Sequence, residues 1–187
     1  MEKLLKNLVK SFFAGVAIAL GALVYISVNG GLVGAALFSI GLYLVLWYGL
    51  NLYTGKVGYA NSIKDVPDLL VTIIGNALGC TLSLIIPKSE LVLTIIENKL
   101  NTPLWLVFIK AILCGILIYA GVDQYKKNKQ YAPFLIVVVF ILAGAEHCIA
   151  NLCYFIAART FTIETIIFTI ITIIGNAVGS LAWRYLT

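Results

Sequence analysis

The chain has 187 residues, of which 61% are hydrophobic and only 11% are charged, and its mean hydropathy is +1.03. A soluble domain carries roughly a quarter charged residues, so this composition excludes an ordinary water-soluble fold and indicates folding in a lipid bilayer. The net charge of +5 is spread over loops, with no basic patch interleaved with aromatic residues. Nucleic acid is therefore not an expected partner.

The chain opens with residues 1–10, "MEKLLKNLVK", which are basic and amphipathic and predict a helix lying on the membrane surface. Apolar segments of about span length follow, and the first is too long for a cleaved signal peptide. We predict six transmembrane helices, at residues 11–28, 31–48, 66–86, 104–121, 132–150 and 163–183. Residues 1–187 then form a single transmembrane domain.

The cations fall mainly in the connections between these segments, and they divide unequally. One side carries nine: Lys3, Lys6, Lys10, Lys56, Lys64, Lys126, Lys127, Lys129 and Arg184. The other side carries three, Lys88, Lys99 and Arg159, while Lys110 lies inside the fourth segment. The positive-inside rule predicts a multi-pass protein of the cell (inner or plasma) membrane with both termini cytoplasmic.

An eight-residue word occurs once in each half of the chain. "TIIGNALG" begins at Thr72, and "TIIGNAVG" begins at Thr172, one hundred residues later. Three spans per half is an odd number, so the second half is inserted upside down. The pattern predicts a 3+3 inverted repeat, residues 11–87 and 103–187, with a transport site near the membrane midplane. The glycines of each word favour close helix packing, whereas Asn76 and Asn176 need hydrogen-bond partners at that depth.

The middle span of each half carries polar residues that a continuous helix would expose to lipid. The second contains "GLNLYTGKVGYAN", and the fifth contains "GAEHCIAN", with Glu146, His147 and Asn151. Irregular backbone at membrane depth is tolerated only inside protein or beside a water-filled cavity, so both spans are predicted to be broken. His147 is the only histidine, and an ionisable residue at that depth is a functional candidate. Glu146 is interpreted as a structural group that satisfies the broken backbone.

The four cysteines all lie in apolar segments without C-x-x-C spacing. Such residues usually pack as small buried hydrophobic groups. With a single histidine in the chain, no metal site is expected, and no cofactor is predicted.

Several of these motifs together resemble the formate/nitrite transporter family. "GAEHCIANLCYF" resembles its G-aromatic-E-H-x-x-A-N-M signature, "LNLYTGKV" its loop after the first half of the second span, and "FFAGVAIALGALVYISV" its opening span. The resemblance covers about residues 12–183. It implies an aquaporin-like fold with broken second and fifth helices, and a homopentamer with one pore per protomer. It also implies passage of small monovalent anions such as formate, nitrite or hydrosulfide, or of their neutral acids, across the lipid bilayer.

The resemblance also implies roles for individual residues. His147 matches the central pore histidine, and Thr54 matches the threonine of the loop opposite it. The remaining matches are constriction residues (Phe38, Leu42, Leu52, Tyr53 and Phe140) and pore or substrate residues (Lys99, Asn151, Asn76 and Asn176). For Lys99 an ordinary loop cation remains an equal alternative. Three departures bear on substrate and gating: Gly115 replaces a usual Asn, Lys56 is a foreign charge, and Ala145 replaces an aromatic residue.

The expected mechanism follows from the cost of an anion in an apolar passage, which is of order 20 kcal/mol for an idealised medium of low dielectric. Protonation of a weak acid removes that cost. Lys99 and Lys56 are expected to attract the anion to the two mouths. His147 then either lends a proton or stabilises the anion until water protonates it.

Three other functions compete with this one. An intramembrane enzyme using Glu146 and His147 lacks a nucleophile, so an enzyme is not predicted. A non-conducting membrane scaffold would explain the short loops and Gly115. A channel for small neutral solutes shares the inverted repeat, but the paired Asn-Pro-Ala motifs of aquaporins are absent.

Overall fold

The computed structural model describes residues 2–187, and all regular structure in that range is helical. The helices are α1 (Glu2–Ser27), α2 (Gly31–Trp47), α3 (Tyr53–Lys56), η1 (Val57–Tyr59), η2 (Ile63–Asp65), α4 (Val66–Gly79), η3 (Cys80–Ile85), α5 (Glu90–Leu100), α6 (Leu104–Lys126), α7 (Ala132–Leu142), α8 (Cys148–Ala158) and α9 (Ile163–Leu186). These described residues thus form nine α-helices rather than the six predicted. Each broken middle span contributes two of these helices, α2 with α3 and α7 with α8, and α5 is an additional helix between α4 and α6.

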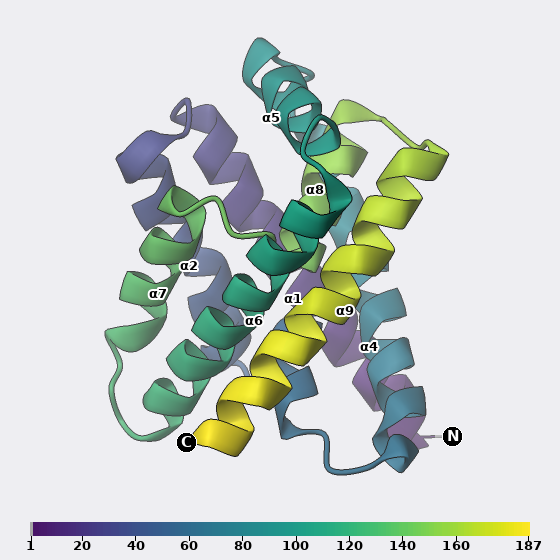
Figure 1. Ribbon diagram of the computed structural model, residues 1–187, viewed down its shortest axis with the longest axis vertical. Coiled ribbons are helices and arrows are strands. Elements are labelled where there is room, and N and C mark those ends of the chain that lie inside the picture. Colours follow the sequence, from purple (N-terminus) through teal and green to yellow (C-terminus); the bar gives the residue numbers. More distant parts are fainter. Residues whose placement is uncertain (1) are drawn as a thin grey trace.

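The helices form a bundle around a buried centre (Figure 1). Helix α1 packs against α2 and α4, α6 packs against α7 and α9, and α2 packs against α7. Helix α8 lies in the interior, where all of its residues except Leu152 are buried. In Figure 1, α5 lies at one end of the bundle, and the start of α1 and the end of α9 lie at the opposite end.

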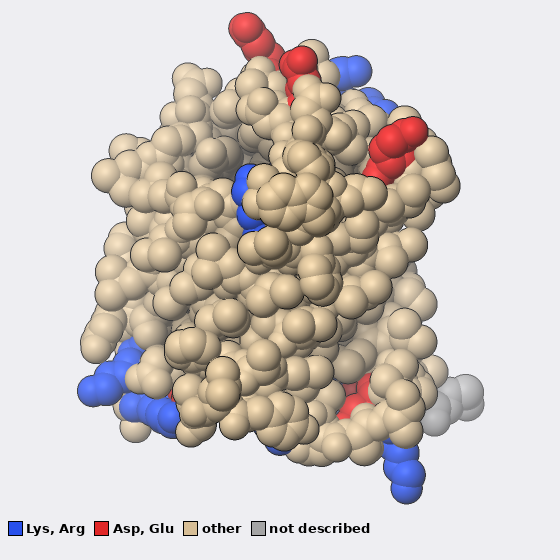
Figure 2. All heavy atoms as spheres, viewed as in Figure 1, with Lys and Arg blue, Asp and Glu red and all other residues tan. Residues whose placement is uncertain are grey.

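The outer surface fits a lipid environment. Four helical stretches of the described chain are long and apolar enough to cross a membrane: residues 2–27, 63–85, 104–126 and 163–186. Figure 2 shows charged side chains gathered at the two ends, with an almost uncharged band between them. Along α4, Leu70, Ile74 and Leu78 form an exposed apolar stripe, one residue per helical turn. The fold is therefore that of an all-α, multi-pass membrane protein.

The start of the chain differs from the prediction. Residues 2–10 do not form a separate surface helix, because α1 continues without a break from Glu2 to Ser27. One side of this first segment packs on α4: the Asn7 amide donates to Asp68 Oδ1 at 2.7 Å, and Asn7 and Ser11 are buried. Residues 1–10 contain no glycine or proline to end a helix, so packing against α4 extends the span instead.

Both middle spans are broken where the sequence predicted, and the same local structure ends the first half of each. The turn that follows α2 has Gly49 at φ 56°, and the N–H of Leu50 donates to Val45 O at 2.8 Å. The turn that follows α7 has Gly144 at φ 64°, and the N–H of Ala145 donates to Phe140 O at 2.9 Å. These are helix C-terminal motifs that favour glycine in the left-handed conformation.

The glycines of the repeated word lie where helices cross. A Cβ on Gly79 would lie 2.7 Å from Val16 N on α1, and one on Gly179 would lie 3.0 Å from Ile116 N on α6. Gly115 packs the same way, because a Cβ there would lie 2.9 Å from the Asn176 carbonyl carbon. The departure at position 115 therefore belongs to helix packing, with no room for a side chain.

We expect Gly79→Ala and Gly179→Ala to destabilise the bundle by about 1–3 kcal/mol or more, the usual cost of overpacking. The added methyl group can only be accommodated by separating two backbones. Thermal unfolding in detergent measures the effect. Gly55→Ala is the matched control, because its Cβ would meet Val122 at an ordinary 3.5 Å. Equal melting temperatures for all three variants would contradict the packing role.

All four cysteines are buried and free, as the sequence predicted. They are Cys80, Cys114, Cys148 and Cys153.

Candidate functional site

Asn76 holds the break between α2 and α3. Its amide nitrogen donates to Ser11 O at 2.7 Å and to Asn51 O at 2.8 Å, and its oxygen accepts from Tyr53 N at 2.9 Å. The side chain is fully buried. One carboxamide thus pairs three backbone groups that the break would otherwise leave without partners.

Asn176 does the same for the break between α7 and α8. It donates to Ala111 O and to Glu146 O, both at 2.8 Å, and accepts from Cys148 N at 2.9 Å. The partners of the two asparagines correspond along the chain, with Ser11 and Ala111 one hundred residues apart. Neither Asn76 nor Asn176 lines the two cavities described below, and the contacts of both side chains are with the backbone.

Glu146 has a different partner from the one predicted. Its carboxylate accepts from Lys99 Nζ at 2.6 Å, and this pair is largely buried. The broken backbone is held by Asn176 instead, so the interpretation of the Glu146 side chain as its anchor is wrong. Lys99 lies in the last turn of α5, not in a loop, and its ammonium group also lies 5.9 Å from the ring centre of Tyr154.

His147 is the residue that precedes α8, and both of its ring nitrogens are engaged. Nδ1 accepts from the backbone N–H of Ala150 at 3.1 Å, which caps the helix. Nε2 lies 2.9 Å from Thr54 Oγ1 on α3. Because a backbone N–H can only donate, Nδ1 must be unprotonated, and the neutral imidazole carries its proton on Nε2, facing Thr54. The two residues matched to the family's central pair are thus in contact and fully buried.

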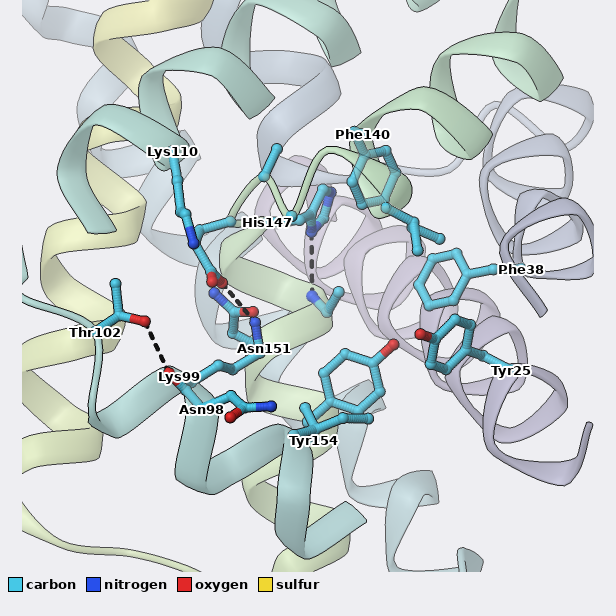
Figure 3. A pocket seen from close by; sticks show the side chains of 16 residues that line it. Tyr25, Phe38, Asn98, Lys99, Thr102, Lys110, Phe140, His147, Asn151 and Tyr154 are labelled. Carbon is cyan, nitrogen blue, oxygen red and sulfur yellow. Dashed lines mark hydrogen bonds and ion pairs between the residues drawn. The ribbon is translucent and has the colours of Figure 1, made fainter. Parts of the chain in front are cut away.

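A cavity of about 260 Å³ opens on the α5 side of His147. Figure 3 shows side chains from several helices pointing into it. We call it the α5-side cavity; its polar and aromatic lining is Tyr25, Phe38, Asn98, Lys99, Thr102, Lys110, Phe140, Glu146, His147, Asn151 and Tyr154.

Two aromatic rings face each other at the His147 end of this cavity. The centroids of Phe38 and Phe140 are 6.2 Å apart with the rings nearly perpendicular. The Phe140 ring also stacks on the His147 imidazole, with centroids 5.9 Å apart. Both phenylalanines are buried, so this end of the cavity is apolar except for the imidazole.

A second cavity, of about 320 Å³, lies on the side of the chain termini. We call it the terminal-side cavity. Leu42 and Leu52 are buried in its wall, and Lys56 and Lys126 also line it. Lys56 Nζ is 2.7 Å from Asp68 Oδ2, so the positive charge of Lys56, which departs from the family's pattern, is neutralised by the Asp68 carboxylate.

Tyr53 is turned away from both cavities. Its hydroxyl donates to Ile173 O on α9 at 3.2 Å, and its ring lines a groove beside α4 and α9. The prediction that Tyr53 forms a constriction is therefore wrong for this structure. Leu52, Tyr53 and Thr54 enter a helical turn and point in different directions: Leu52 lines the terminal-side cavity, and Thr54 contacts His147.

Two lysines that line the cavities, Lys110 and Lys126, were not predicted as site residues. Lys126 Nζ lies 3.3 Å from the ring centre of Tyr59. Lys110 had a usable signal, because an ionisable residue within an apolar span is a candidate site by itself. The aromatic wall formed by Tyr25 and Tyr154 had no such signal, since these residues come together only through tertiary contacts.

Broken helices that meet at a buried polar group between two cavities are typical of membrane transport proteins. The sequence profile described as "Formate/nitrite transporter" matches residues 1–186, so the chain belongs to that family. This confirms the resemblance drawn from the motifs. The family's name and the relatives described next are those of transporters and channels rather than of enzymes.

One curated relative is the "Uncharacterized transporter YrhG" of Bacillus subtilis (strain 168). It is 29% identical over 213 residues, which cover 92% of this chain and 79% of the relative. The fold is similar to a solved "FNT family ion channel", with a TM-score of 0.86, 22% identity, and coverage of 98% of this chain and 90% of that one. It is also similar to a "Pentameric formate channel with formate bound", with a TM-score of 0.81, 21% identity, and coverage of 99% and 94%.

Proposed function

We propose that the protein is a transmembrane channel or transporter for small monovalent anions of weak acids, of the formate, nitrite or hydrosulfide class. The observation that carries this proposal is the single buried imidazole bonded to Thr54 at 2.9 Å, with a cavity on either side. Phe38 and Phe140 narrow one side of it, and Leu42 and Leu52 narrow the other. Membership of the formate/nitrite transporter family supports the same conclusion.

The architecture that serves this function is six spans in an inverted repeat within one domain, residues 1–187. In this arrangement α2 with α3 and α7 with α8 each cross the membrane as one broken span, and α5 lies outside the spans. Residues 11–87 form the first repeat and 103–187 the second. The support is the matched contacts: Gly75 faces Ser11 and Phe12, and Gly175 faces Ala111 and Ile112.

The proposed setting is the cell membrane, with both termini cytoplasmic. The cation-rich connections predict this orientation, and both termini lie at one end of the bundle (Figure 1). A homopentamer is the proposed assembly, since one solved structure of similar fold is described as pentameric. The exposed apolar stripes on α4 and α9 offer surface to lipid and to neighbouring protomers.

Passage would proceed by neutralising the anion rather than by carrying its charge through. Between the apolar constrictions a bare anion lacks water, and the idealised cost is of order 20 kcal/mol. His147 is neutral in the observed hydrogen-bond pattern, so its Nε2–H is a donor and a poor source of a proton. We therefore favour the second of the two routes: the imidazole and Thr54 stabilise the anion while a proton from the bulk solution reaches it through the water of the cavity.

The steering role expected for Lys99 and Lys56 is weakened by their partners. Both lysines are ion-paired, with Glu146 and Asp68 respectively. A cation paired at such short range contributes little net field at the mouth of a cavity.

Flux into proteoliposomes tests the function. Purified protein should admit formate, nitrite and hydrosulfide faster than protein-free liposomes do, with little effect on glycerol, and the anion flux should rise as the pH falls. Flux of glycerol alone would instead support a small neutral-solute channel. Absence of flux for every solute would support a non-conducting scaffold and overturn the proposal.

A further inference from the structure

The α5-side cavity holds more positive charge than its ion pair accounts for. Its lining contains two ammonium groups, Lys99 and Lys110, and one carboxylate, Glu146. Lys99 and Glu146 neutralise each other at 2.6 Å. The ammonium group of Lys110 has no ion pair or hydrogen bond with any side chain of residues 2–187. The lining therefore carries one net positive charge.

Lys110 is positioned to place that charge inside the cavity. It projects from α6 toward the side of the cavity that holds Lys99 and Asn151 (Figure 3). The turn after α7 lies beside it, because a Cβ added to Gly144 would be at van der Waals distance, 4.0 Å, from Lys110 Nζ. A cation within an apolar span is costly unless a counter-charge is near. The position therefore favours an anion as the missing partner.

Asn151 provides a second, independent indication in the same cavity. The side chain is 1% exposed, and its amide nitrogen has no hydrogen-bond partner among residues 2–187. Buried donors without an acceptor are uncommon in folded proteins. Asn76 and Asn176, with the same side chain and similar burial, are fully paired, so Asn151 differs from both in having an unpaired amide nitrogen.

We propose that Lys110 and Asn151 form a binding subsite for one small planar oxyanion, a carboxylate or nitrite, in the α5-side cavity. The inference rests on the proposed function and narrows its substrate class. One net positive charge matches a monoanion. Two donors on separate helices match two oxygen atoms of one ligand, whereas hydrosulfide and halides present a single acceptor atom.

The binding experiment uses the full chain in detergent, with thermal unfolding followed during titration with sodium formate or sodium nitrite. Sodium chloride at matched ionic strength controls for general salt effects. A ligand that binds only the folded protein raises the melting temperature as its sites fill. We expect saturable stabilisation by formate and nitrite and none by chloride.

Three variants locate the subsite. Lys110→Met should raise the half-saturating concentration about tenfold or more, as loss of a charge-assisted hydrogen bond implies. Lys110→Arg, which keeps the charge, should retain most of the affinity. Lys88→Met is the matched control, because Lys88 is exposed and does not line this cavity. If Lys110→Met does not fold, Lys110→Gln replaces it in the comparison.

Two results would overturn the subsite: no saturable response of the wild-type protein to formate or nitrite, or the same half-saturating concentration in the Lys110 and Lys88 variants. The transport proposal fails separately. Wild-type protein that shows the expected titration but no flux in liposomes would retain the subsite and lose the channel.

Discussion

Asn176→Leu should prevent stable folding or lower the free energy of unfolding by several kcal/mol. The substitution removes the partners of Cys148 N, Ala111 O and Glu146 O at once. Each buried backbone group left without a partner costs about 1–3 kcal/mol, and Asn176 is fully buried. Thermal unfolding in detergent, together with the yield of folded protein on size-exclusion chromatography, measures the loss.

Asn76→Leu should cost as much, because its three partners are equivalent. Asn151→Leu is the matched control for stability, since it makes the same chemical change at a residue that is equally buried but has an unpaired amide nitrogen. A loss for Asn151→Leu as large as for Asn176→Leu would show that the three hydrogen bonds are not the source of the effect.

The elements that hold this fold could be predicted because their signals are local. Gly49 and Gly144 adopt the left-handed conformation in the turns that follow α2 and α7, which glycine favours. Asn76 and Asn176 lie in an octamer that is repeated almost unchanged in the sequence. A polar amide in an apolar helix demands partners, and the only polar backbone available was in the broken spans. The sequence therefore predicted the helix breaks and the residues beside them.

The residues that line the cavities were harder to predict, because their roles depend on the direction in which each side chain points rather than on sequence spacing. Tyr53 and Thr54 are adjacent, yet one points at α9 and the other at His147. The role of Glu146 was predicted from its neighbours in the sequence, whereas its ion-pair partner Lys99 comes from α5, a helix that was not predicted. The prediction of a separate surface helix at the start of the chain differs from the structure for a similar reason, because packing against α4 keeps this segment in line with the rest of α1.

The two halves share a backbone plan but differ in the side chains at the centre. Leu52 precedes α3, and His147 occupies the corresponding position before α8. The asparagines behind them make equivalent bonds, so the frame does not depend on which side chain stands at the break. If the proposed mechanism holds, removal of the imidazole should therefore affect flux more than folding.

His147→Phe should reduce formate and nitrite flux into proteoliposomes by roughly ten- to a hundred-fold, the range implied by losing a hydrogen bond to a charged group worth about 1.5–3 kcal/mol. Phenylalanine fills the space beside Phe140 but offers no donor to an anion between the constrictions. It also cannot cap α8, which should cost about 1 kcal/mol of stability. Melting temperatures and elution profiles must therefore accompany the flux measurements.

His147→Asn separates the two losses. Its oxygen can accept from Ala150 N as the imidazole Nδ1 does, and its N–H can face Thr54, so both the cap and a donor remain. We expect it to retain much more flux than His147→Phe.

The flux of Thr54→Val should fall toward that of His147→Phe, and the flux of Thr54→Ser should stay near wild type, because the hydroxyl of Thr54 makes the contact with His147. Unchanged uptake by His147→Phe at acidic pH would remove the imidazole from the mechanism, since the neutral acid would then cross without a donor at the centre.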